Sequence, residues 1–168
     1  PDVDEAIHSQ LKRGIIFSLP SELEIQLAEK LVEIIPSAEM VRFGKNGSDA
    51  TSAAIRLARA YTGKNHIAIS GYHGWHDWYL AANLGDDNNL DGHLLPGLEP
   101  KGVPSNLRGT TLTFNYNQID ELEKVIADHD IGLIKMEVSR SISTGNEFLQ
   151  KVRKLSSDNG IILIFDEC

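Results

Sequence analysis

The chain has 168 residues, of which 41% are hydrophobic and 24% charged, a composition typical of a soluble globular protein. Its formal net charge of −8 argues against a non-specific binder of nucleic acid or of an acidic membrane, because such a protein needs a basic face. No apolar stretch approaches the ~20 residues that cross a bilayer. The single cysteine, Cys168, permits no internal disulfide, which favours a reducing cytoplasm as the location.

The sequence begins at Pro1 without a methionine and ends at Cys168, directly after an apolar run. We therefore expect a fragment of a longer protein. A domain of this length hides about 70% of the surface of its unfolded chain, so the fragment is long enough to form a core.

Segments with helical and extended patterns alternate along the chain. Residues 21–35 predict an amphipathic helix, with a capping box at Ser21 and Glu24 and apolar residues that recur every four positions. The other predicted elements, in chain order, are an extended piece at 41–43, a helix at 48–61, strands at 66–70 and 110–114, a helix that begins near Asn117, a strand at 131–138, a helix at 147–157 and a strand at 161–165. This alternation predicts the α/β fold class with a mainly parallel sheet.

The last predicted strand, 161–165, consists of five apolar residues, which is typical of a strand buried on both faces of a parallel sheet. Two other stretches lack any periodic pattern. Residues 84–109 are rich in Gly, Asn, Asp and Pro, and so long an irregular segment is usually functional or mobile. We expect this segment and residues 139–145 to shape a ligand pocket.

The first candidate site is Asn46-Gly47-Ser48, at the start of the alanine-rich helix. A glycine turn that opens a helix exposes backbone N–H groups at the positive end of the helix dipole, and this arrangement binds phosphate. The alternative is an ordinary helix cap in which Ser48 caps its own helix. The spacing is not the Walker pattern, because no Gly-Lys-Ser/Thr follows.

The second candidate is the aromatic and histidine-rich segment 71–78, which follows a predicted strand. Rings just past a strand end can form a stacking surface for a flat aromatic ligand. A metal site of His73, His76 and Asp77 is a second possibility, but three residues of one turn rarely complete a coordination sphere. Ordinary packing of amphipathic aromatic side chains is the third.

The third candidate is the acidic pair Asp166-Glu167, directly after the last strand. Such a pair holds Mg²⁺ in nucleotide hydrolases, but that site also needs a phosphate loop with its lysine, which this sequence lacks. A carboxylate buried at a strand end otherwise needs a cationic or hydrogen-bonding partner, and a protonated heterocycle nitrogen would serve. Glu137, at the end of the strand at 131–138, is a second acid at the same edge, with simple surface exposure as its alternative.

Taken in order, these segments resemble the class III aminotransferases of fold type I, especially their members similar to glutamate-1-semialdehyde aminomutase. The segments that carry the resemblance are Ser21–Ile35, Val41–Gly63, Gly71–Asp77, Asn115-Tyr116-Asn117 and Ile161–Glu167. The resemblance implies pyridoxal 5′-phosphate as cofactor and a three-layer α/β/α large domain, of which residues 1–168 would be an incomplete part. The implied reaction moves an amino group between an amino donor and an aldehyde or keto acceptor.

The same resemblance implies which residues would contact the cofactor's phosphate and one face of its ring. Gly47 and Ser48 would hold the phosphate, and Asn46 stands where serine or asparagine is usual. Tyr72 would stack on the pyridine ring, and His73 would lie beside it.

The resemblance also assigns the two strand-end acids. Asp166 would pair with the ring nitrogen and keep it protonated, so that the ring accepts electrons. Glu137 matches a glutamate that the family follows with proline, here replaced by Val138, and the segment 139–145 departs from the family pattern. The contact of Glu137 with the cofactor's phenolic oxygen is therefore an open expectation.

The catalytic lysine is expected outside this chain. In the family, the Schiff-base lysine lies a few tens of residues after the strand-end aspartate, which places it beyond Cys168, and Lys135 lies in mid-strand. No metal is expected. The expected partners are a small-molecule amino donor and a carbonyl acceptor, without nucleic acid or membrane, and the full-length protein is expected to be a homodimer.

Two hypotheses compete with the aminotransferase. One is a nucleotide-dependent α/β hydrolase that uses Asp166 and Glu167 to bind Mg²⁺. The other is a non-catalytic interaction module. Neither the sequence motifs nor the resemblance indicates a particular amino donor.

Overall fold

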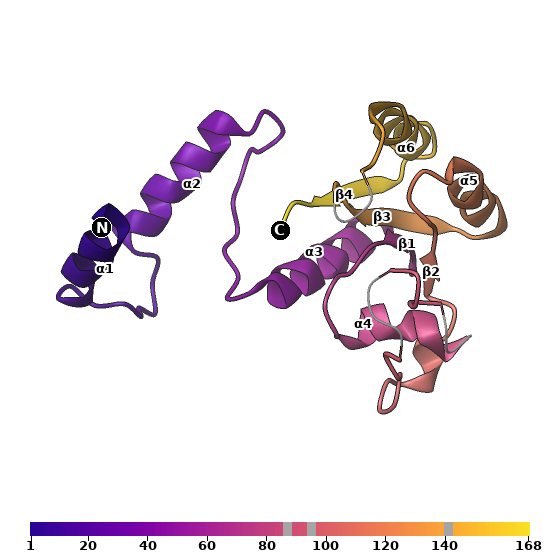
Figure 1. Cartoon of the computed structure of the whole chain (residues 1–168), viewed down its shortest axis with the longest axis horizontal. Coiled ribbons are helices and arrows are strands. Elements are labelled where there is room, and N and C mark those ends of the chain that lie inside the picture. The colour runs from indigo at the N-terminus through magenta and orange to yellow at the C-terminus, as the bar shows by residue number, and fades with distance from the viewer. Residues whose placement is uncertain (86–88, 94–96, 140–142) are drawn as a thin grey trace. The chain divides into compact units, whose positions relative to one another are not determined.

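A computed structural model describes residues 1–85, 89–93, 97–139 and 143–168. Parts of the two stretches expected to shape the pocket, residues 86–88, 94–96 and 140–142, lie outside the described residues. The chain divides into two compact units, residues 1–43 and residues 44–168 (Figure 1). In the part of the chain that is described, every helix is too short or too polar to cross a bilayer.

The first unit consists of two helices, α1 (Asp2–Leu11) and α2 (Glu22–Ile34). The capping box predicted at the start of α2 is confirmed, because the Ser21 hydroxyl accepts from the backbone N–H of Glu24 and the Glu24 carboxylate accepts from that of Ser21. Helix α1 was not predicted, and its acidic first turn complements the helix dipole. Residues 41–43 have irregular backbone rather than strand structure.

The second unit is built on a four-stranded parallel sheet with the order β2-β1-β3-β4. Its strands are β1 (His66–Ser70), β2 (Thr111–Thr113), β3 (Ile131–Glu137) and β4 (Ile162–Asp166). The predicted α/β class and parallel sheet are therefore confirmed, and each predicted strand lies within a residue or two of its observed place.

Helices cover both faces of this sheet (Figure 1). The helical segments of this unit are α3 (Gly47–Thr62), α4 (Asp77–Leu80), the 3₁₀ turns η1 (Ala81–Leu84) and η2 (Ser105–Leu107), α5 (Ile119–Asp128) and α6 (Asn146–Asp158). One core joins α3 and α4 to the sheet through residues such as Ile55, Ile69 and Tyr79. The other joins α5 and α6 to the opposite face through residues such as Leu122 and Val152.

The prediction that the last strand is buried on both faces is wrong for the described residues. Strand β4 lies at the edge of the sheet, paired only with β3, and its residues are half-buried, with Phe165 40% exposed. Strand β3 has the expected burial instead, since its first six residues are all buried between neighbours on both sides. The predicted start of α5 is also shifted, because Asn117 adopts a positive φ of 62° and the helix begins at Ile119.

Gly132 on β3 is a point of close approach between the sheet and the end of α3. A Cβ added there would lie 2.8 Å from both Lys64 Cβ and Thr62 Oγ1, closer than real carbon contacts allow. The residue is buried, so the neighbouring backbone has little room to move.

We expect Gly132→Ala to lower the free energy of unfolding by about 1–3 kcal/mol, because the added methyl group overpacks this contact. Urea denaturation followed by circular dichroism would measure the change. Gly85→Ala is the matched control, because a Cβ at Gly85 meets no atom within 4 Å and its φ is negative. Equal stability of the two variants would contradict the close approach.

Candidate functional site

One cleft at the carboxyl ends of the strands collects all seven residues expected to bind the cofactor. Its volume is about 510 Å³, and its lining residues are Asn46, Gly47, Ser48, Asp49, Thr51, Tyr72, His73, Gly74, Trp75, His76, Glu137, Asp166 and Cys168. Strands β1, β3 and β4 run parallel, so their carboxyl ends open at the same edge of the sheet. Such an edge is the usual ligand site of open α/β folds, and the volume is within the range of small-molecule pockets.

The start of α3 forms one wall of the cleft. Asn46 is the helix cap, because its side-chain oxygen accepts from the backbone N–H of Asp49 at 2.9 Å and its amide donates to the Asp49 carboxylate at 2.9 Å. The alternative in which Ser48 caps its own helix is therefore wrong. Gly47 and Ser48 lie in the first turn, where backbone N–H groups have no carbonyl partner within the helix.

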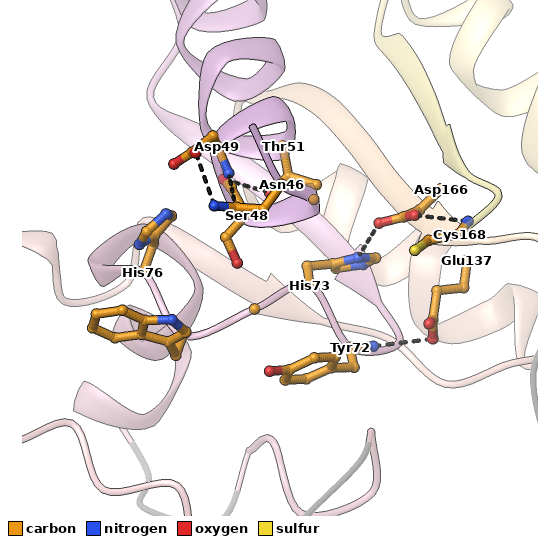
Figure 2. Close-up of a pocket in the computed structure, with 13 residues that line it drawn as sticks. Asn46, Ser48, Asp49, Thr51, Tyr72, His73, His76, Glu137, Asp166 and Cys168 are labelled. Carbon is orange, nitrogen blue, oxygen red and sulfur yellow. Dashed lines mark hydrogen bonds and ion pairs between the residues drawn. The ribbon is translucent and has the colours of Figure 1, made fainter. Parts of the chain in front are cut away.

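Gly74 brings the loop after β1 against this helix start. Its φ of +104° is in the left-handed region, and a Cβ there would lie 2.5 Å from Ser48 Oγ. Only glycine fits both conditions. The loop therefore passes close to Ser48 and presents Tyr72 and His73 to the same cleft, as Figure 2 shows.

Glu137, at the end of β3, is half-buried and hydrogen-bonded rather than simply exposed. Its Oε2 accepts from the backbone N–H of Tyr72 at 3.1 Å and from the Tyr116 hydroxyl at 3.3 Å. Glu137 therefore fixes the backbone at Tyr72. Tyr116 belongs to the segment 115–117 that carried the resemblance, but sequence reasoning gave it no role.

Asp166, at the end of β4, contacts a histidine, a lysine and a backbone N–H. Its Oδ2 lies 3.2 Å from His73 Nδ1, and its Oδ1 accepts from the backbone N–H of Cys168 at 3.3 Å (Figure 2). The same Oδ2 lies 2.5 Å from Lys135 Nζ. The His73 ring and the Lys135 ammonium hold the pKa of the Asp166 carboxyl well below its usual range, against the opposing effect of partial burial. The carboxylate is thus ionised at neutral pH.

The contacts and the burial of His73 together define its tautomer. Nε2 lies 3.0 Å from the Ser70 carbonyl oxygen, which only accepts, so Nε2 carries the proton. Nδ1 lies between Lys135 Nζ, a donor at 2.9 Å, and Asp166 Oδ2, an acceptor at 3.2 Å, so its contacts alone do not assign its state. Burial lowers the pKa of His73, and the Lys135 charge lowers it further while Asp166 opposes. The imidazole is therefore neutral at neutral pH, and with the proton on Nε2 its Nδ1 accepts from Lys135.

Lys135 is the residue that sequence reasoning missed. It lies in β3 with 1% of its surface exposed, and its Nζ contacts both His73 and Asp166. A signal was present, because a lysine within the otherwise apolar run 131–136 must find a buried partner. The strand-end acid Asp166 was the available partner.

This geometry fits neither a metal site nor a nucleotide hydrolase. Both ring nitrogens of His73 are engaged by Ser70 and Lys135, and within the described ranges no three His, Cys, Asp or Glu side chains gather as metal ligands. In a nucleotide hydrolase Asp166 would bind Mg²⁺, but here its carboxylate is paired with the Lys135 ammonium.

The whole sequence, residues 1–168, matches the family model described as aminotransferase class-III. The chain belongs to the class-III aminotransferases. Among similar family members, it is 38% identical to the glutamate-1-semialdehyde 2,1-aminomutase of Methanothermobacter thermautotrophicus, with 99% of this chain and 40% of that protein covered. It is 35% identical to the 3-aminobutyryl-CoA aminotransferase of Cloacimonas acidaminovorans, with 99% and 38% covered. The chain thus spans about two fifths of the length of these relatives.

Solved transaminase structures share its fold. An omega-transaminase from Sphaerobacter thermophilus superposes with a TM-score of 0.83 at 32% identity, covering 99% of this chain and 40% of that one. A transaminase with pyridoxal phosphate bound superposes with a TM-score of 0.85 at 28% identity, with the same coverage. The α/β/α arrangement is therefore that of the transaminase large domain.

We expect His73 to remain neutral, with the proton on Nε2, below the ordinary histidine pKa of about 6.5. Because the folded pKa is lowered, the unfolded chain takes up the proton first. The His73 contribution to stability is therefore present above pH ~6.5 and is lost as the pH falls below it. Nitrogen-15 NMR of the imidazole would report the tautomer and its titration. A doubly protonated ring at pH 7 would contradict the assignment.

Proposed function

We propose that this chain is most of the cofactor-binding large domain of a pyridoxal-phosphate enzyme that transfers an amino group. The observation that carries the proposal is the single cleft that joins a helix start to an ionised strand-end carboxylate. The two ends of this cleft match the two charged ends of the cofactor, an anionic phosphate and a basic ring nitrogen. Membership of the class-III aminotransferases supports the same reaction class.

The phosphate would be held at the start of α3. Backbone N–H groups of Gly47 and Ser48 are in the first turn, where the helix dipole favours an anion, and the Ser48 hydroxyl is a further donor. Asn46 keeps this turn formed through its two hydrogen bonds with Asp49.

The ring would lie between Tyr72 and the acids. The cofactor, when bound, supplies an electron sink for the carbanion formed at the substrate. Asp166 would accept the proton of the ring nitrogen, and Tyr72 would stack on the ring. His73 braces Asp166 from the side, and Glu137 fixes the Tyr72 backbone. These groups orient the ring and set the charge around its nitrogen.

The complete protein would contain further parts of the site. By the class-III resemblance, we expect the lysine that would bind the cofactor covalently to lie after Asp166, outside this chain. We propose a homodimer in the cytoplasm that acts on a small-molecule amino donor and a carbonyl acceptor. The relatives include both an aminomutase and an aminotransferase, which supports either an intramolecular or an intermolecular transfer.

The direct test is to add pyridoxal phosphate to the full-length protein and to assay amino-group transfer. Binding would appear as an absorbance band distinct from that of the free cofactor, and transfer as consumption of an amino donor. A full-length protein that neither shifts the absorbance nor consumes any amino donor would contradict the proposal.

We expect Asp166→Asn in the full-length protein to reduce turnover by about 10³-fold or more, because the uncharged amide no longer stabilises a protonated ring nitrogen. Steady-state kinetics would measure the loss. Glu167→Gln is the matched control, because Glu167 is the exposed neighbour of Asp166 and should retain activity. If the two substitutions were equally damaging, the acidic pair would act together, as in the hydrolase hypothesis.

A further inference from the structure

A buried lysine stands behind the carboxylate of the cleft. Lys135 pairs with Ile164 of β4 in the sheet register, two pairs before Glu137 and Asp166. It is 1% exposed, and it is not one of the residues that line the cleft, whereas Asp166 is. Its ammonium therefore reaches Asp166 from inside the sheet, while the cleft is open to Asp166 from the other side.

The ammonium depends on Asp166 as its main counter-charge. Lys135 Nζ lies 2.5 Å from Asp166 Oδ2, and its second contact, 2.9 Å to His73 Nδ1, is with a neutral ring. The other charged group on β3, Glu137, accepts hydrogen bonds from Tyr72 and Tyr116. A buried ammonium without a partner is strongly unfavourable. Any ligand that weakens the ion pair between Lys135 and Asp166 therefore costs free energy.

Asp166 is also tied to β3 through its backbone. Its carbonyl oxygen accepts from the N–H of Val138 at 3.2 Å. A proline at position 138, which the resemblance to the family leads one to expect, would have no N–H to donate. Lys135 and Val138 together hold Asp166 against β3 by a side-chain and a main-chain contact.

We propose that Lys135 is a built-in counter-cation of Asp166, so that a basic ring nitrogen entering the cleft competes with Lys135 for the same carboxylate. This inference rests on the proposed function. A second cation beside Lys135 is repelled, because the two positive charges share one negative charge in a partly buried site. The cleft therefore binds a pyridine ring less tightly, and protonates its nitrogen less readily, than Asp166 alone would.

The test measures binding of two non-covalent probes to the full-length protein. Pyridoxine 5′-phosphate carries an alcohol in place of the aldehyde, so its binding needs no lysine. Its carbocyclic analogue, with carbon in place of the ring nitrogen, has the same shape and phosphate but no basic atom. Titration calorimetry is done at pH 8, above the ordinary histidine pKa of about 6.5, because removal of the Lys135 charge raises the pKa of His73 beside Asp166.

The variants separate the charge of Lys135 from its volume. Lys135→Met keeps an unbranched side chain of similar length in the buried strand, and Lys135→Gln keeps a polar donor without charge. Lys64→Met is the matched control. It removes an ion pair of 2.8 Å between Lys64 and Asp130 at the opposite end of β3, and so makes the same change of net charge.

We expect Lys135→Met and Lys135→Gln to bind pyridoxine 5′-phosphate about tenfold more tightly than the wild type. Affinity for the carbocyclic analogue should change less than about twofold, and Lys64→Met should change neither. Nitrogen-15 NMR of the labelled ring should show a higher ring-nitrogen pKa in both Lys135 variants. Lys135→Gln provides the result if Lys135→Met does not fold.

Two outcomes would overturn the inference while leaving the proposed function intact. One is wild-type binding of pyridoxine 5′-phosphate that the Lys135 substitutions leave unchanged or weaken. The other is equal tightening for both probes, which would show that the ring nitrogen is not what Lys135 opposes. Failure of every form to bind either probe would instead overturn the proposed function, and the inference with it.

Discussion

The parallel register of β1, β3 and β4 is the constraint on which the site depends. Parallel pairing brings the residues after Ser70, the end of β3 at Glu137 and the end of β4 at Asp166 to one edge of the sheet. Side chains separated by up to 93 positions in the sequence thereby come within hydrogen-bonding distance. Helix α3 supplies the remaining wall, because it leads into β1 and its start lines the same cleft.

Sequence patterns predicted well those helices and strands whose caps and apolar spacing are visible in a short stretch of sequence. Helix α2 has a capping box, and the apolar run of β3 is long enough to be recognised as a strand. Strand β4 shows the limit of such reasoning, because its five apolar residues are indistinguishable from those of a central strand. Its edge position depends on which strands lie beside it. Helix α1 has apolar residues at a helical spacing, Val3, Ile7 and Leu11, but it lacks the side-chain cap that marks the start of α2.

The candidate site was predictable to a similar extent. The seven residues named from motifs and resemblance share one cleft because each stands at a strand end or a helix start, and those places are visible in the sequence. Lys135 and Tyr116 were not predicted, because their roles arise from contacts between distant strands and loops. The neutral state of His73 likewise depends on Ser70 and Lys135, and no motif contains those two contacts.

The cap of α3 has a consequence for how this site can change. Asn46 and Asp49 hold the first turn together, so Ser48 is not required for the helix to begin. Folding and ligand recognition thus rest on different side chains of one short turn. Under the proposed function, substitutions at position 48 would alter which anion is accepted while the helix stays intact. Substitutions at position 46 would loosen the turn while leaving the Ser48 hydroxyl in place. A site divided in this way can diversify its ligands at little cost in stability.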